Sequence, residues 1–221
     1  MPGTIRERVK RVLEPVLYRR PVPELPPERL YLFCDALWQS RALPGTVVEV
    51  GCFQCGTSAW AFSMLKAIGV NRSYLGIDTF RGFNSEQFLR DAQWGTSPIK
   101  ARGFQANSRV LVERMLQRWD CSAIQLIEAD IVDMPASLLP DRIAVALVDV
   151  DIEAPTRAAL EKLHPLMVPG GTILVDDCDK DPANPFRGAR VAYERFVAEH
   201  GLPERYLFGM GCVGALKAGE F

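Results

Sequence analysis

Four aspartates in two pairs, Asp149 with Asp151 and Asp176 with Asp177, each end an apolar segment of the chain. Neighbouring parallel strands would bring them to one edge of a sheet, where the carboxylates repel one another unless one is protonated or a cation intervenes. An oxygen-only donor set without histidine or cysteine favours Mg²⁺ over Zn²⁺. The sequence therefore predicts a Mg²⁺ site with Asp149, Asp176 and Asp177 as ligands. Alternatively, these acids cap helices or pair with Arg187 and Arg190.

A second group of residues, 49–58, forms a predicted turn between an apolar strand and a helix. Gly51 and Gly56 let the backbone turn sharply and approach a ligand closely. Phe53 stands where the dinucleotide fingerprint G-x-G-x-x-G has its second glycine, which disfavours NAD. A cofactor that presents an amino acid to the loop fits better, with Glu49 accepting a hydrogen bond from its ammonium group. An ordinary strand-to-helix turn is the alternative. The expected contacts in this loop are Glu49, Gly51, Phe53, Gly56, Thr57 and Ser58.

Two further acids end apolar segments and suggest an adenosine group. Asp78, followed by Thr79, lies about 27 residues beyond the first glycine of the loop, where one carboxylate can bind both hydroxyls of a ribose. By itself Asp78 could equally cap the next segment. Asp130, with Ile131 beside it, is the expected neighbour of the adenine ring. Together with the glycine loop, these residues favour an adenosine cofactor.

The elements that must position these residues alternate between strand and helix. Apolar runs predict strands at 46–51, 74–78, 124–129, 143–150 and 172–176, and a closing hairpin at 205–216. Helices are predicted at 26–41, 57–68, 104–118, 155–166 and 188–200. This order predicts an α/β fold with a doubly wound, mostly parallel seven-stranded sheet and helices on both faces.

The polar, aperiodic stretch 80–103 is predicted to be a long functional or disordered loop. Its aromatic residues could close over bound ligands as a lid, or could simply pack against the domain. These aromatic residues are Phe80, Phe83, Phe88 and Trp94.

Composition excludes several classes of partner and setting. The chain has 221 residues and a net charge of −1, which predicts one domain and no nucleic-acid partner. A basic run at 6–20 indicates a solvated helix face or arm, with a polyanion or anionic membrane as the alternative. No apolar run is long enough to cross a membrane. Six cysteines without a secretion signal favour a reduced, cytoplasmic setting. Cys52 and Cys55 form a C-x-x-C pair that could be redox-active or half of a zinc site, but zinc would need a second pair or histidines at matching spacing, and the chain has only His164 and His200.

The motifs occur in an order that resembles the macrocin O-methyltransferase family of bacterial class I enzymes. The matching stretches are Glu49-x-Gly51, Asp78-Thr79-Phe80-Arg81-Gly82-Phe83, Asp149-x-Asp151, the run from Pro169 to Asp177, and Gly188-Ala189-Arg190-x-Ala192-x-x-x-Phe196. The resemblance covers residues 44–200, and the double aspartate after Pro169-Gly170-Gly171 is its most specific part.

This resemblance implies a Rossmann-like methyltransferase domain at 44–221 that uses S-adenosylmethionine and Mg²⁺. Residues 1–43 would be an arm and helix that contribute to the substrate pocket or to an oligomer contact, since a homo-oligomer is left open. Asp149, Asp176 and Asp177 match the metal ligands of the family. Asp149 would also lie near the cofactor, and Asp149 or Asp151 would be the base at the acceptor hydroxyl.

The implied reaction is methyl transfer to a hydroxyl of a small molecule, such as a sugar or another natural-product intermediate. The alternatives are a catechol-type phenol methyltransferase and a non-catalytic protein that binds S-adenosylmethionine. Two departures separate the chain from the family pattern. Gln54 and Cys55 stand where the family usually has glycines, and 153–156 lack its usual aromatic and Ser-Thr residues. The segments before 44 and at 84–103 carry no match, so the acceptor is not identified.

Overall fold

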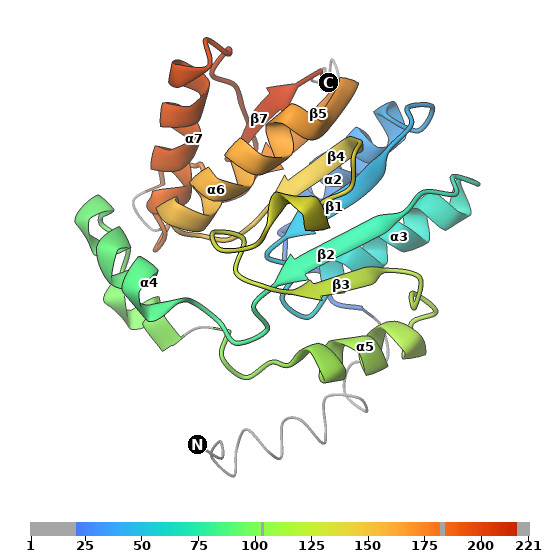
Figure 1. The fold of residues 1–221 in the computed structure, drawn as a ribbon, viewed down its shortest axis with the longest axis horizontal. Coiled ribbons are helices and arrows are strands. Elements are labelled where there is room, and N and C mark those ends of the chain that lie inside the picture. Colours follow the sequence, from blue (N-terminus) through green and yellow to red (C-terminus); the bar gives the residue numbers. More distant parts are fainter. Residues whose placement is uncertain (1–20, 103, 182–183, 216–221) are drawn as a thin grey trace.

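The computed structural model describes residues 21–102, 104–181 and 184–215, and the basic run at 6–20 lies outside these ranges. Seven strands form one sheet in the order β3-β2-β1-β4-β5-β7-β6 (Figure 1). The strands are β1 (Thr46–Val50), β2 (Tyr74–Asp78), β3 (Gln125–Glu128), β4 (Ile143–Val148), β5 (Met167–Val175), β6 (Tyr206–Leu207) and β7 (Met210–Gly214). Strands β1 to β5 pair in parallel, whereas β7 pairs antiparallel with β5 and β6. The predicted mostly parallel sheet and its closing hairpin are confirmed.

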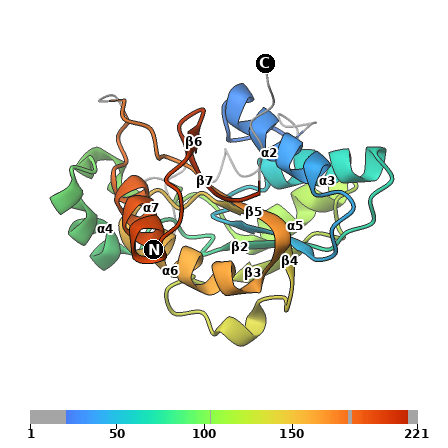
Figure 2. The ribbon, with the colours of Figure 1, turned by 90° about the horizontal axis from the view of Figure 1, so that it is seen from above.

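Helices cover both faces of the sheet, with α2 and α3 on one side and α6 on the other (Figure 2). The α-helices are α2 (Pro27–Gln39), α3 (Gly56–Ala67), α4 (Ser85–Asp91), α5 (Arg109–Arg118), α6 (Glu153–Leu163) and α7 (Gly188–Glu199). Short 3-10 turns are η1 (Ala92–Trp94), η2 (Pro98–Arg102), η3 (Ala136–Leu138) and η4 (His164–Leu166). The predicted α/β class with helices on both faces is therefore correct.

The core consists of two apolar clusters, one on each face of the sheet. One cluster joins α2, α3 and α5 to residues such as Val47, Val145 and Leu147. The other joins α6 and α7 to alternating residues of the same strands, such as Val48 and Ala146. Since β4 is buried at every position, its continuous apolar sequence fits a strand covered on both faces.

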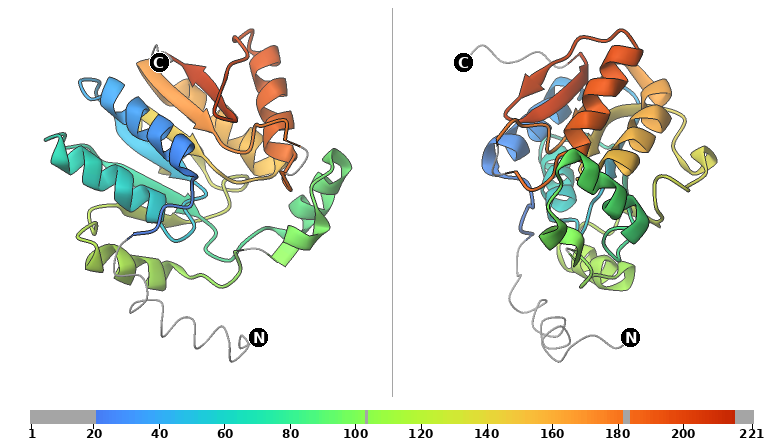
Figure 3. Two further views of the ribbon diagram at one scale, coloured as in Figure 1. Left: turned by 180° about the vertical axis from the view of Figure 1, so that it is seen from behind. Right: turned by 90° about the vertical axis from the view of Figure 1, so that its left-hand side faces the viewer.

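The stretch 80–103 differs from the predicted loop, because it contains α4 and two 3-10 turns that project beyond the edge of the sheet (Figure 3). The side chain of Asn84 caps α4 by accepting hydrogen bonds from the N–H groups of Glu86 and Gln87. The short length of α4 leaves little helical periodicity to detect. Helix α5 likewise begins later than predicted, because the Ser108 side chain caps it through the N–H of Leu111.

The segment Pro169-Gly170-Gly171 lies inside β5, although its composition suggests a turn before the strand. The pairing between β4 and β5 shifts register in this region, which accommodates the extra residues. A side chain at Gly171 would meet the carbonyl oxygen of Ala144 at 2.9 Å. The glycine thus permits close packing within the sheet.

Candidate active site

A cavity of about 350 Å³ opens at the carboxyl ends of the parallel strands. It brings together ten of the residues predicted from the sequence to act on a cofactor, metal or substrate. They are Gly51, Phe53, Asp78, Thr79, Asp130, Ile131, Asp149, Asp151, Asp176 and Asp177. The predicted cofactor residues and the predicted acidic residues therefore share one cavity.

Four predicted loop residues, Glu49, Gly56, Thr57 and Ser58, are buried and do not line the cavity. The Glu49 carboxyl accepts hydrogen bonds from the hydroxyl of Ser58, at 2.6 Å, and from that of Tyr74. Burial raises the pKa of Glu49 to about 7 despite these two bonds. Both of these bonds end on Oε2, so Oε1 keeps lone pairs that can accept a bond from an ammonium group.

The end of β1 is pressed against the end of β4 at Gly51. Gly51 has φ +92°, and a Cβ there would lie 1.7 Å from the carbonyl oxygen of Asp149. Only glycine combines this left-handed backbone with so close an approach. The glycine predicted to contact a ligand therefore also places the loop directly beside the first aspartate of the acidic group.

Asp78 is held by the backbone on both oxygens. Its carboxyl accepts hydrogen bonds from the N–H of Phe53, at 2.8 Å, and from the N–H of Phe80, at 2.6 Å. Burial raises its pKa, and the two backbone bonds oppose that rise. Each oxygen keeps further lone pairs, so the group can still accept bonds from a ribose diol.

Asp130 is oriented by its own loop and by α4. One oxygen accepts a bond from the N–H of Val132 at 2.9 Å, and the other accepts one from the Gln87 amide at 2.8 Å. Gln87 also lines the cavity, and so does Ile131, the buried residue that follows Asp130 in the chain. The region 80–103 therefore closes the predicted adenine end of the cavity through Gln87.

Phe53, Phe83, Phe104 and Phe186 form an aromatic wall of the cavity. Phe83 contacts the rings of Phe88, Phe104 and Phe186 with centroid distances of 4.9 to 5.9 Å. Phe53 contacts Phe104 edge-on at 5.1 Å. These rings give the cavity an apolar surface suited to a flat or hydrophobic ligand group.

The segment before α2 crosses the start of α3. The Glu24 carboxyl accepts a bond from the N–H of Thr57 at 3.1 Å, while the N–H of Glu24 donates to the Thr57 hydroxyl at 3.2 Å. A side chain at Gly56 would collide with the carbonyl oxygen of Val22 at 1.8 Å. Although Glu24 as a whole is exposed, burial of its carboxyl group in the cavity wall raises the pKa to about 7.

The acidic end of the cavity brings three carboxylates within reach of one ion. Oxygens of Asp149, Asp151 and Asp177 all lie within 4.8 Å of one another. Mg²⁺ binds oxygens at about 2.1 Å, so ligands around one ion lie at most about 4.2 Å apart and the group needs only a small contraction. The chemistry of this donor set fits a divalent cation. The ligands predicted from the sequence were Asp149, Asp176 and Asp177, so Asp151 stands in this close group where Asp176 was expected.

Charge crowding is severe at this end. Burial, together with repulsion from Asp176 and Asp151, raises the pKa of Asp149 well above its usual range. Burial and Asp177 do the same to Asp151. Burial and Asp177 raise the pKa of Asp176 to about 6, against the lowering effect of Arg29. A bound cation would relieve this repulsion.

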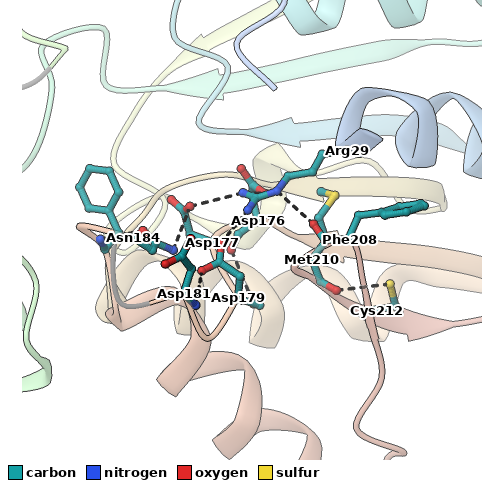
Figure 4. Close-up of polar contacts among 11 residues, drawn as sticks. Arg29, Asp176, Asp177, Asp179, Asp181, Asn184, Phe208, Met210 and Cys212 are labelled. Atoms are coloured by element: carbon teal, nitrogen blue, oxygen red, sulfur yellow. Dashed lines mark hydrogen bonds and ion pairs between the residues drawn. The ribbon is translucent and has the colours of Figure 1, made fainter. Parts of the chain in front are cut away.

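Arg29, in the first turn of α2, lies over the double aspartate (Figure 4). Its guanidinium forms ion pairs with Asp176 at 2.7 Å and with Asp179 at 2.6 Å, and lies 3.5 Å from Asp177. Pairing of the acids with Arg187 and Arg190 was the alternative to a metal site. Arg190 instead pairs with Glu194 on its own helix.

The backbone is strained at several points around the cavity. Four of its lining residues, Phe53, Phe104, Asp151 and Asp177, have positive φ without being glycine. Such conformations cost about 1–3 kcal/mol each and cluster at functional sites. Two of the three aspartates in the potential cation site adopt them, which supports a functional reason for their placement.

Sequence reasoning did not identify Arg29, Glu24, Gln87 or Phe186 as site residues. Arg29 and Glu24 precede the first motif, and Gln87 lies in the stretch that carries no family match. Phe186 follows the double aspartate closely and could have been suspected from that position. Only the tertiary structure brings the other three to the cavity.

Within the described residues, no helix combines the length and apolar character needed to cross a membrane.

Comparison with known proteins identifies the fold and the family. The chain is similar to the solved structure of the O-methyltransferase NovP, with a TM-score of 0.74 and 17% identity, covering 96% of this chain and 99% of that one. It is also similar to the calicheamicin methyltransferase CalS11, with a TM-score of 0.69 and 21% identity over 97% and 94% of the two chains. An O-methyltransferase from Bacillus cereus in complex with SAH matches with a TM-score of 0.55 and 12% identity, over 97% and 93%. At these identities the structures support the methyltransferase fold.

No curated protein sequence matches the chain significantly. The family model of macrocin-O-methyltransferase (TylF), by contrast, matches residues 30–207, which is most of the chain. The match spans β1 to β6, most of the residues that line the cavity and both pairs of aspartates, whereas β7 and the lining residues Glu24, Pro26 and Arg29 lie outside it. The chain therefore belongs to the macrocin O-methyltransferase family and is an S-adenosylmethionine-dependent methyltransferase.

Proposed function

We propose that the protein transfers the methyl group of S-adenosylmethionine to a hydroxyl oxygen of a small molecule, with Mg²⁺ bound at the acidic end of the cavity. The observation that carries the proposal is the continuity of the cavity. It extends from Asp78 and Asp130, which suit an adenosine group, to Asp149, Asp151 and Asp177, which suit a cation and a hydroxyl.

The donor would lie along the ends of β1, β2 and β3. Asp78 would accept bonds from the ribose hydroxyls, with Thr79 next to it, while Asp130 and Ile131 flank the adenine. The loop 49–58 would hold the amino-acid part, and its buried members Glu49, Gly56, Thr57 and Ser58 would act mainly by fixing the turn. The sulfonium would then face the ends of β4 and β5.

The acceptor would bind at the acidic end. When bound there, Mg²⁺ supplies a positive charge that lowers the pKa of the acceptor hydroxyl. Asp149, Asp151 and Asp177 would hold this ion, whereas Asp176 is engaged by Arg29. A vicinal diol suits the arrangement, since one oxygen can anchor while its neighbour reacts.

The chemical step is an in-line displacement. A lone pair of the acceptor oxygen attacks the methyl carbon, the carbon–sulfur bond breaks, and its electron pair stays on sulfur as S-adenosylhomocysteine leaves. The hydroxyl proton would pass to the carboxylate of Asp149 or of Asp151, both of which line the acidic end of the cavity. Orientation of the donor and the acceptor within one cavity would contribute further acceleration.

The acceptor class is proposed as a sugar hydroxyl of a natural product or of its activated precursor. Family membership supports this class, and one structural neighbour is described as a TDP-rhamnose 3'-O-methyltransferase of calicheamicin biosynthesis. An acceptor that combines a sugar with an apolar ring system would use both the acidic end and the wall formed by Phe83, Phe104 and Phe186.

A catechol-type phenol is the second candidate acceptor. The same aromatic wall favours it, because Phe83 and Phe186 could stack against an aromatic diol while both of its oxygens approach the acids. A phenol ionises more readily than a sugar hydroxyl. It would therefore depend less on the cation and on the base.

A methyl-transfer assay separates these cases. The purified chain is incubated with S-adenosylmethionine and three acceptor sets: nucleotide sugars, glycosylated natural products and catechols. Each set is measured with Mg²⁺ and with a chelator. We expect turnover of a sugar-containing acceptor that the chelator abolishes and Mg²⁺ restores. Turnover confined to catechols would favour the second candidate, and undiminished turnover in chelator would refute the proposed metal.

A further inference from the structure

Arg29 of helix α2 contacts several carboxylates at the acidic end of the cavity. Its Nη1 donates to Asp176 at 2.7 Å and its Nη2 donates to Asp179 at 2.6 Å, across about 150 residues of sequence (Figure 4). Its Nη1 also reaches Asp177 at 3.5 Å. One guanidinium thus contacts three carboxylates at the end of β5.

The position of Arg29 is built from three separate segments. Besides α2 and the loop after β5, the turn between β6 and β7 contributes, because the Arg29 Nε donates to the carbonyl oxygen of Phe208 at 3.2 Å. A side chain at Gly209 would meet both Asp179 and the Arg29 Nη2, at 2.9 and 3.0 Å. Only 14% of the Arg29 side chain is exposed. The guanidinium is therefore enclosed.

Arg41, just beyond the end of the same helix, is a surface arginine whose contacts can be compared with those of Arg29. It donates to the carbonyl oxygen of Trp38 at 2.9 Å and lies over the ring of the same residue. It touches no carboxylate of the cavity. The contacts of Arg29 are consequently specific to its place at the acidic end.

The position of Arg29 places a positive charge beside the four aspartates of the acidic end. Asp149, Asp151, Asp176 and Asp177 are crowded into one buried region, and a fixed positive charge reduces their repulsion before any metal binds. Burial disfavours the guanidinium charge, but Asp176 and Asp177 outweigh that effect and raise the pKa of Arg29. Arg29 is therefore charged at every working pH. The same charge repels an incoming divalent cation.

We propose that Arg29 is a resident counter-ion that competes with the divalent cation for this acidic edge. It binds Asp176 and Asp179 and leaves Asp149, Asp151 and Asp177 for the cation. Arg29 thereby keeps the site compact without metal and weakens metal binding, so that the ion is exchangeable. This inference rests on the cation site of the proposed function. Arg29 acts through the aspartates and is a positioning residue.

The test is a titration with Mn²⁺, a paramagnetic substitute for Mg²⁺, followed by electron paramagnetic resonance. The proteins are the unmodified chain, Arg29→Met, Arg29→Lys and the control Arg41→Met. We expect Arg29→Met to bind Mn²⁺ at least tenfold more tightly. Arg29→Lys, which keeps the charge but cannot bridge two carboxylates, should lie between Arg29→Met and the unmodified chain. Arg41→Met should match the unmodified chain.

A second measurement is thermal unfolding with chelator and with Mg²⁺. Arg29→Met should have the lower Tm in chelator and should gain more Tm from Mg²⁺ than the unmodified chain gains. A merely structural arginine would lower Tm equally in both conditions and would not tighten Mn²⁺ binding. If Arg29→Met does not fold, the order of Arg29→Lys and the unmodified chain still decides the question.

The outcomes distinguish the two proposals. Equal or weaker Mn²⁺ binding by the Arg29 variants, with normal binding by the unmodified chain, overturns the counter-ion role and leaves the proposed function intact. No Mn²⁺ binding by any of the four proteins overturns the metal of the proposed function and the counter-ion role with it.

Discussion

The two ends of the cavity satisfy their buried acids in different ways. At the donor end, each oxygen of Asp78 accepts a bond from a backbone N–H, and Glu49 is bonded by Ser58 and Tyr74. At the acidic end, Asp149 and Asp151 crowd against further carboxylates. At the donor end, neutral hydrogen-bond donors of the chain satisfy the buried carboxyl groups. At the acidic end, the repulsion among the carboxylates favours binding of a cation.

The donor end is therefore preorganised by the fold, whereas the acidic end is preorganised only in part. Backbone donors at Asp78 form with the strands and cost nothing when a ligand arrives. The acidic end has Arg29 as a built-in positive charge, but three oxygens remain within 4.8 Å of one another. Changes at the two ends should therefore affect different steps.

The largest expected effect comes from the acidic end. Asp149→Asn should lower kcat by about 10²–10⁴, because it removes both a cation ligand and a potential base. The affinity of this variant for S-adenosylmethionine, measured by calorimetry, should differ from that of the unmodified chain by less than about threefold. A change of that size is the scale of a peripheral contact. A variant that loses donor binding and turnover in parallel would erase the distinction between the two ends.

The reciprocal change at the donor end should be smaller and should fall on binding. Asp78→Asn weakens the acceptor of two backbone bonds and of the ribose, and should reduce donor affinity by about 10- to 100-fold. Its Mn²⁺ affinity should equal that of the unmodified chain. Loss of Mn²⁺ binding in Asp78→Asn would mean that the two ends are not independent.

A pH dependence of stability should arise from Glu49. Its folded pKa of about 7 lies above the ordinary value of 4.5, so the folded state favours the protonated form. The stability it contributes is present below pH 4.5 and is lost as pH rises through 7, amounting to about 3 kcal/mol at most. Glu49→Gln keeps partners for Ser58 and Tyr74 and should flatten the curve of unfolding free energy against pH.

Denaturant unfolding between pH 5 and 8, with both proteins in chelator, measures this effect. The acidic end contributes a change of the same sign, so only the difference between Glu49→Gln and the unmodified chain reports on Glu49. Parallel curves for the two proteins would show that Glu49 titrates normally and that the donor end is less buried than described.

The smallest expected effect concerns the aromatic wall. Phe83→Leu keeps an apolar side chain but removes ring contacts with Phe88, Phe104 and Phe186. The acceptor KM should rise by about three- to tenfold, the scale of one aromatic contact of about 0.5–1.5 kcal/mol, while kcat stays nearly unchanged. Steady-state kinetics with the preferred acceptor provide the measurement, and an unchanged KM would remove Phe83 from the acceptor site.

Much of the fold was predictable because its strands are continuous apolar runs ending in acids. Strand β2 matches its predicted range 74–78, and β4 and β5 place Asp149 and Asp176 side by side at the sheet edge as expected. The helix α4 was not predicted, because a short segment capped by Asn84 carries almost no periodicity. Local side-chain capping, rather than hydrophobic pattern, determines that element.

The site was predictable where it follows strands and unpredictable where it depends on distant segments. Asp78 and Asp149 follow the rule that ligands bind at the carboxyl ends of parallel strands. Arg29 meets Asp176 across about 150 residues, and no sequence pattern links them. Asp176, which lies outside the close group of Asp149, Asp151 and Asp177, is the aspartate in that unpredicted ion pair.

The most direct test of the difference between the two ends is to measure donor affinity and turnover in the same chelator titration. As Mg²⁺ is removed, we predict that turnover of the preferred acceptor falls to the background rate and returns when Mg²⁺ is added. The affinity for S-adenosylmethionine, measured by calorimetry in the same samples, should stay constant, because the donor end is completed by the chain. Full turnover in chelator, or loss of donor binding together with the metal, would contradict this account.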